Sequence, residues 1–134
     1  MNKYFIDTSF VIALINQKDE YHNWAVELSD SLAGSQYITS DLILYEIANY
    51  LAKDFKPEAI NTINIFLNSK DIQIIWNSED LFKQAFEKYT TFADKKWGLV
   101  DCLSFIIMEK LEIQNVLTID HHFEQAGFTL MKTI

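Results

Sequence analysis

Residues Tyr4–Leu14 read YFIDTSFVIAL and place a single carboxylate, Asp7, between two apolar runs. An ionised carboxylate in apolar surroundings costs several kcal/mol unless a partner compensates its charge. The run before Asp7 has the length of a buried strand, and the run after it predicts a helix that Asp7 or Thr8 caps. The rest of the chain must therefore supply a partner for Asp7.

Short apolar strands alternate with helices along the whole chain. Strands are expected at 3–6, 36–39, 72–76, 115–119 and 129–132. Helices are expected at 9–16, 21–33, about 41–53, about 57–69, 79–92 and 99–112. This alternation predicts an α/β fold, a three-layer α/β/α sandwich around a mainly parallel sheet of four or five strands. In such sheets the active site lies at the carboxyl ends of the strands.

Length and composition predict one domain, 1–134, with an ordinary apolar content of 49%. No apolar run reaches the ~18 residues of a membrane span, and the N-terminus lacks the features of a signal peptide. A single cysteine, Cys102, fits a cytoplasmic protein. The net charge of −8 disfavours a simple nucleic-acid-binding protein and favours a cationic partner. It does not exclude a nuclease, because catalytic carboxylates that a metal neutralises are counted as negative.

Four carboxylates lie at positions where the neighbouring residues are mostly apolar and an ionised side chain is unexpected. Asp7 and Asp120 directly follow expected strands, so both project from the carboxyl edge of the sheet. Glu46 has mostly apolar neighbours one helical turn away, and Asp101 lies in the first turn of an almost wholly apolar helix. Helix capping, a turn or the rim of an amphipathic helix would explain each of them singly.

Together the four acids predict a common metal site. Carboxylates that converge on one pocket repel one another, and protons or a multivalent cation must neutralise them. A site made of carboxylate oxygens suits Mg²⁺ or Mn²⁺, and the sequence has no His/Cys cluster at zinc spacing. His121 and His122 are adjacent and point apart, so they are interpreted as loop residues, one of which could contact a substrate phosphate.

The ordered set of motifs resembles the PIN-domain family, and within it the VapC-like toxins of toxin–antitoxin pairs. The motifs are Asp7 in a hydrophobic-Asp-Thr-Ser context, Glu46 in a mid-chain helix, Asp101 at the start of an apolar helix, and Thr118-x-Asp120-x-x-Phe123. The resemblance covers nearly the whole chain. It implies an α/β/α sandwich and an Mg²⁺- or Mn²⁺-dependent endoribonuclease that acts as the toxin of a type II toxin–antitoxin system.

The resemblance also implies roles for the residues that match. Asp7 and Asp101 correspond to direct metal ligands, and Glu46 and Asp120 complete the catalytic cluster directly or through water. Asp94 lies where many relatives carry another acid, although its polar surroundings are also typical of a loop. Many relatives carry a Ser at the position of Gly98, so the hydroxyl that would cap the following helix is missing here.

The chemistry follows from the expected metal, and the partners follow from the same resemblance. A water activated by the metal would attack the RNA phosphate in line. Thr8 and Ser9 would contact a phosphate oxygen, or serve as ordinary helix caps. Lys95, Lys96 and Trp97 are either a basic rim with a stacking aromatic or a solvated loop. Expected partners are the RNA substrate, a cognate antitoxin and a second copy of the chain.

Four other classes of protein share parts of this pattern. Asp-Thr-Ser is close to the Asp-Thr-Gly of aspartic proteases, but Ser9 replaces the glycine and the pattern is not all-β. Dehalogenase-type phosphotransferases need a second Asp at position 9. Receiver domains need a phosphoacceptor Asp after the third strand, where this chain has Trp76 and Asn77. A catalytically silent PIN-like binding module is the remaining alternative, against which the intact set of four acids argues.

Overall fold

The computed structural model describes residues 2–132, and the strands of this region form one sheet. They are β1 (Lys3–Ile6), β2 (Gln36–Ser40), β3 (Ile72–Ile75), β4 (Asn115–Leu117) and β5 (Thr129–Leu130). The order across the sheet is β3-β2-β1-β4-β5, and all neighbouring strands are parallel. The parallel sheet expected from the sequence is confirmed.

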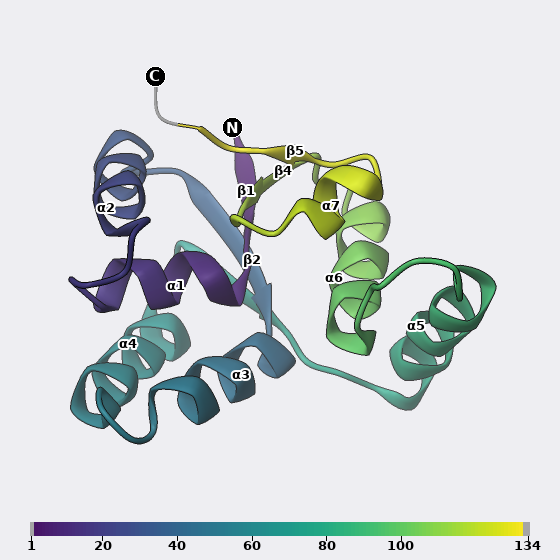
Figure 1. Cartoon of the computed structure of the whole chain (residues 1–134), viewed down its shortest axis with the longest axis horizontal. Helices are drawn as coiled ribbons and strands as arrows, with labels where there is room; N and C mark the ends of the chain where they lie inside the picture. Colours follow the sequence, from purple (N-terminus) through teal and green to yellow (C-terminus); the bar gives the residue numbers. More distant parts are fainter. Residues whose placement is uncertain (1, 133–134) are drawn as a thin grey trace.

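Helices cover both faces of this sheet (Figure 1). They are α1 (Thr8–Ile15), α2 (His22–Ser31), α3 (Asp41–Leu51), α4 (Lys56–Asn68), α5 (Glu79–Thr91), α6 (Leu99–Lys110) and α7 (His121–Gln125). Because parallel crossovers are right-handed, α1–α4, which connect β1 to β2 and β2 to β3, share one face, and α5–α7 share the other. The three-layer sandwich is therefore confirmed. No helix within the described residues is long and apolar enough to cross a membrane.

The chain changes direction across the sheet between β1 and β4. From β1 it proceeds through β2 to β3, and it then returns to the other side of β1 at β4. At such a switch point the flanking connections leave a crevice at the carboxyl ends of the strands. The register pairs Ile6 with Leu117, and the Asp7 amide donates to the Leu117 carbonyl at 3.2 Å. The residues after β1 and β4 are thereby placed side by side.

The expected end of β4 was wrong by two residues. The sequence predicts strand to Ile119, but β4 ends at Leu117. After that point the Ile119 amide donates to the Ser9 hydroxyl oxygen at 3.1 Å, and the Asp120 amide donates to Thr118 Oγ1 at 3.0 Å. Side chains at the switch point satisfy these backbone donors, so the chain leaves the sheet there without a buried unpaired N–H.

Helix α7 corrects the interpretation of His121 and His122 as loop residues. The Asp120 side chain accepts from the His122 amide at 2.9 Å, which starts a five-residue helix. Phe123 is fully buried and meets Phe105 of α6 edge to face, with ring centroids 5.0 Å apart. A helix of this length is too short to produce a recognisable hydrophobic period, so the sequence pattern missed it.

Trp97 belongs to the core, so both interpretations of it, as a stacking platform for RNA and as part of a solvated loop, are wrong. Its side chain is only 7% exposed and packs edge to face on Phe105, with centroids 5.1 Å apart. The indole N–H donates to Gln125 Oε1 at 3.0 Å. Trp97 therefore ties the α5–α6 connection to α7 and cannot present its ring to a base.

Candidate metal-dependent active site

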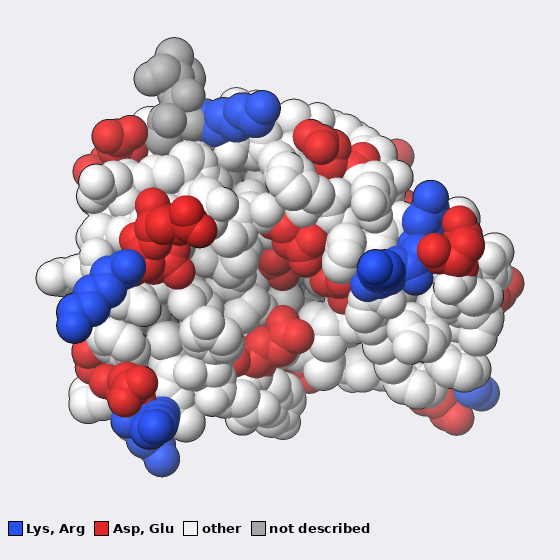
Figure 2. All heavy atoms as spheres, in the orientation of Figure 1, with Lys and Arg blue, Asp and Glu red and all other residues white. Residues whose placement is uncertain are grey.

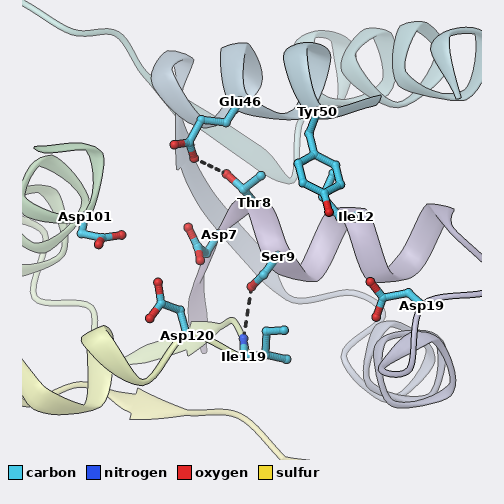
Figure 3. Close-up of a pocket in the computed structure, with 10 residues that line it drawn as sticks. All are labelled: Asp7, Thr8, Ser9, Ile12, Asp19, Glu46, Tyr50, Asp101, Ile119 and Asp120. Atoms are coloured by element: carbon cyan, nitrogen blue, oxygen red, sulfur yellow. Dashed lines mark hydrogen bonds between the residues drawn. The ribbon is translucent and has the colours of Figure 1, made fainter. Parts of the chain in front are cut away.

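All four predicted acids line one cavity of about 300 Å³ at the carboxyl edge of the sheet. The remaining lining residues are Thr8, Ser9, Ile12, Asp19, Tyr50 and Ile119. Figure 3 shows Asp7, Glu46, Asp101 and Asp120 directed toward a common space from four different elements, while Asp19 and Tyr50 stand at the other end. The fold brings the four acids together, as their positions after strands and in apolar helices predicted.

Asp7 is the most deeply buried of the four acids, with 7% of its surface exposed. It occupies the N-cap position of α1, but its side chain makes no capping hydrogen bond. Capping therefore does not explain its presence. The pKa of Asp7 is raised to about 7, chiefly by burial. The charges of Asp101 and Asp120 contribute to this rise, and hydrogen bonds from Thr118 and the Thr8 amide oppose it. In the absence of a cation this carboxylate is poorly compensated.

A chain of hydroxyl groups holds the Asp7 carboxylate in place. Thr118 Oγ1 donates to Asp7 Oδ2 at 2.7 Å. Because that bond uses the only hydroxyl proton of Thr118, the 3.0 Å contact between Ser9 Oγ and Thr118 Oγ1 has Ser9 as donor. Ser9 Oγ in turn accepts from the Ile119 amide. The Ser9 hydroxyl is thus committed within the protein, which argues against its expected contact with a phosphate.

Glu46 is positioned by Thr8 across the cavity. Thr8 Oγ1 donates to Glu46 Oε1 at 2.6 Å, a short bond to a charged acceptor (Figure 3). Glu46 projects from the middle of α3, whose buried side carries Ile43, Leu44 and Ile47. Packing of that apolar side against the core directs Glu46 to the cavity, and Thr8 limits its rotation.

Asp101 and Asp120 cap the two helices that carry them. Asp101 Oδ2 accepts from the Gly98 amide at 3.0 Å, so the first turn of α6 is closed without the hydroxyl that Gly98 lacks. His122 connects the two acids. Its Nδ1 lies 3.0 Å from Asp101 Oδ2 and 3.3 Å from Asp120 Oδ1.

Comparison with known proteins agrees with this geometry. The PIN domain model matches residues 4–129, which is nearly the whole chain. The chain belongs to the PIN-domain family. The family resemblance predicted from the four acids and their motifs is confirmed.

One relative is similar over almost its full length. The 23S rRNA-specific endonuclease VapC20 of Mycobacterium tuberculosis is 32% identical over 124 residues, which cover 92% of this chain and 94% of VapC20. The crystal structure of VapC20, described as a sarcin–ricin loop cleaving toxin, superposes with a TM-score of 0.88 at 31% identity, over 96% of this chain and 98% of that one.

More distant structures share the fold alone. VapBC2 from Rickettsia felis, bound to a DNA fragment from its promoter, superposes with a TM-score of 0.70 at 19% identity, over 96% of this chain and 97% of that chain. FitAcB from Neisseria gonorrhoeae has a TM-score of 0.63 at 15% identity, with 96% of both chains covered. The PIN fold is thus retained where little sequence similarity remains.

The donor atoms of this PIN domain fit a divalent cation. Asp101, Asp120 and His122 each offer one atom within 4.8 Å of the others. Asp7 adds a buried carboxylate whose ionisation is disfavoured unless a positive charge is close. Carboxylate-rich donors suit a hard divalent ion.

The sequence-based prediction missed two residues of the site and included one that does not line the cavity. It did not find Thr118 as the donor to Asp7 or His122 as the group between Asp101 and Asp120. A signal existed for His122, since it lies two residues after an Asp that can start a helix. Conversely, Asp94 is not brought to the cavity. Its side chain is 74% exposed and lies 3.8 Å from the Lys95 ammonium.

Proposed function

We propose that this PIN domain is a metal-dependent endoribonuclease that acts as the toxin of a type II toxin–antitoxin pair. The observation that carries the proposal is the convergence of four carboxylates from four separate elements on one cavity. The ribonuclease and toxin roles expected from the sequence are confirmed by the family match and by similarity to VapC20. The metal, the site roles and the substrate below are proposals.

The proposed metal ligands are Asp7 and Asp101, with Glu46 and Asp120 completing the set. The proposed ion is Mg²⁺ or Mn²⁺, because the donors are chiefly carboxylate oxygens. When bound, such an ion lowers the pKa of a water and offsets negative charge on the phosphate.

The other site residues orient these acids. Thr8 holds Glu46 through its 2.6 Å hydrogen bond, and the Ser9–Thr118 pair holds Asp7. Fixed carboxylates present their free oxygens in one geometry, so less reorganisation is needed when charge develops during the reaction.

The proposed substrate is the sarcin–ricin loop of 23S rRNA. Support comes from VapC20, which cleaves that loop and shares 31% identity and nearly full-length superposition with this chain. The proposed place of action is accordingly the cytoplasm, where ribosomes are.

We expect purified protein to cleave 23S rRNA in bacterial ribosomes with Mg²⁺ or Mn²⁺, and to lose this activity completely in EDTA. Primer extension would locate the cut. Restoring excess Mn²⁺ to the EDTA sample should restore cleavage, which separates metal removal from denaturation. Folded protein that binds Mn²⁺ but cuts neither ribosomes nor total RNA would support the silent binding module instead.

RNA can approach this acidic protein only where its surface is locally positive. The connection between α5 and α6 carries such a surface, formed by Lys95 and Lys96. A second cavity, of about 600 Å³, is lined by Tyr89, Lys95, Lys96, Gly98 and their neighbours. The two cavities are neighbours, because Gly98 lines the second and its amide donates to Asp101, which lines the first. Figure 2 shows acidic residues in the central hollow of this face and a lysine group beside it, over the α5–α6 region. These lysines are proposed to contact phosphates next to the cut.

The double variant Lys95→Glu, Lys96→Glu is expected to raise KM on the order of tenfold with little change in kcat, because phosphate contacts position the RNA. The dependence of log KM on log salt should weaken by about 0.7 for each contacting lysine. Lys3→Glu with Lys70→Glu makes the same charge change at the opposite edge of the sheet, where β1 and β3 begin. If both double variants had equal effects on KM, the loss would reflect the net charge of the protein. A local contact of Lys95 and Lys96 with RNA would then be contradicted.

A cognate antitoxin is the proposed protein partner, and the fold shared with the VapBC2 complex supports it. A homodimer is also proposed. Exposed aromatic side chains form a row on α5, where the Phe82 and Phe86 rings stack with centroids 6.1 Å apart and Tyr89 continues the row. Contiguous exposed apolar surface of this kind is typical of protein interfaces.

A further inference from the structure

The two adjacent histidines of α7 have different surroundings. His121 has 79% of its side chain exposed and lies 3.6 Å from Glu124 on the protein surface. His122 has 31% exposed and lies between Asp101 and Asp120. The pair therefore combines one histidine at the acidic cluster with a neighbouring histidine outside it.

His122 occupies one oxygen of each carboxylate. Asp101 Oδ2 accepts from the Gly98 amide at 3.0 Å and lies 3.0 Å from His122 Nδ1. Asp120 Oδ1 accepts from the His122 amide at 2.9 Å and lies 3.3 Å from the same Nδ1. Among the described residues, the second oxygen of each acid has no hydrogen-bond partner within the protein. Each carboxylate is thereby divided into one oxygen held by the protein and one that is free.

The proton on Nδ1 follows from its neighbours. Ionised carboxylates only accept hydrogen bonds, so the ring nitrogen that faces two of them must donate. One N–H directed between two acceptors at 3.0 and 3.3 Å forms a shared hydrogen bond. A donor in this position offsets the mutual repulsion of the two acids and limits their separation.

Packing of α6 against α7 holds this arrangement. Asp101 and Phe105 are four residues apart on α6, so they lie on the same side of that helix. Phe105 meets Phe123, the residue after His122, edge to face with centroids 5.0 Å apart. The buried aromatic contact therefore sets the position of His122 relative to Asp101.

We propose that His122 is a positioning residue that joins Asp101 to Asp120 and leaves their free oxygens available to a divalent cation. The proposal rests on the metal site proposed above, but it concerns metal binding and is independent of RNA cleavage. In this proposal His122 acts through the two acids, because Nδ1, the ring nitrogen that faces them, is used as a hydrogen-bond donor and cannot bind the cation at the same time.

The test is Mn²⁺ binding to the RNA-free protein, measured by calorimetry on the wild type, His122→Ala, His122→Asn and His121→Ala. His122→Ala should weaken Mn²⁺ binding about 10- to 100-fold, the usual cost of removing a group that orients a metal ligand. His122→Asn should stay within about threefold of wild type, because its amide N–H can donate from nearly the same position. His121→Ala should bind as the wild type does. Thermal melts would show that each variant is folded.

Several results would overturn the proposal. Unchanged Mn²⁺ affinity in folded His122→Ala would show that the bridge does not organise the acids. Equal losses of Mn²⁺ affinity in His122→Ala and His122→Asn, together with nitrogen hyperfine coupling in the paramagnetic resonance spectrum of Mn²⁺ bound to the wild-type protein, would show that His122 is a direct ligand. Absence of Mn²⁺ binding in wild type would remove the site altogether. Wild-type protein that binds Mn²⁺ but cuts no RNA would contradict only the proposed function, while the variants would still test His122.

Discussion

Asp101→Asn is expected to lower the rate of RNA cleavage by more than about 100-fold while leaving the fold intact. Loss of a group that only orients a metal ligand costs about 10- to 100-fold, so loss of a ligand's own charge should exceed this range. The asparagine oxygen can still accept from the Gly98 amide and close the first turn of α6. The measurement is single-turnover cleavage of sarcin–ricin loop RNA in saturating Mn²⁺, with circular dichroism to compare the folds.

Asp94→Asn is the matched control for this variant. It makes the same chemical change seven positions earlier, on a carboxylate that is exposed and does not line the cavity. Its cleavage rate should equal that of the wild type. A folded Asp101→Asn protein that cleaves within threefold of the wild type would show that the acidic cluster does not carry the reaction.

Asp7→Asn is expected to abolish cleavage and, without metal, to stabilise the protein above pH 7. Burial raises the pKa of Asp7 from 3.8 to about 7. Between these values the folded state holds a proton that the unfolded state has lost. The free energy of unfolding of the metal-free wild type therefore falls as the pH rises from about 4 to about 7, and it stays lower above that range. Asparagine carries no charge and avoids this loss.

A pKa shift of this size corresponds to at most about 4 kcal/mol. The melting temperature of metal-free Asp7→Asn at pH 8 should exceed that of the wild type on the order of 10 °C. At pH 4 the two proteins should melt at similar temperatures. Saturating Mn²⁺ should stabilise the wild type and not the variant, because only the wild type binds it in this site.

Thermal melts across this pH range, with and without Mn²⁺, provide the measurement. Asp94→Asn is again the control and should follow the wild-type curve, since its carboxylate is exposed. A metal-free Asp7→Asn protein that melts below the wild type at pH 8 would contradict the account of Asp7 as a buried, poorly compensated charge.

The sequence contained the fold and the four acids because both depend on local patterns. Strand β1 (Lys3–Ile6) and helix α5 (Glu79–Thr91) follow from short apolar runs and from a capping serine, Ser78, whose hydroxyl accepts from the Leu81 amide. Asp7 and Asp120 were recognisable because they follow strands, and parallel strands bring their carboxyl ends to one edge.

The orientation of each acid, in contrast, depends on residues distant in sequence. Ser9 and Thr118, which hold Asp7, are 109 positions apart, and their contact exists only because β4 pairs with β1 in a particular register. His122 reaches Asp101 because Phe123 packs on Phe105. No local pattern in the sequence predicts these contacts.

Trp97 is a case in which the local sequence pattern and the tertiary structure disagree. Beside two lysines in a polar stretch it had the pattern of a surface aromatic, yet α7 and Phe105 bury it. The sequence by itself determined the order of the elements other than α7, the parallel sheet and the identity of the four acids, since hydrophobic period and capping are local. The tertiary structure decided which oxygens of those acids are free and which groups hold them, because these depend on strand register and helix packing.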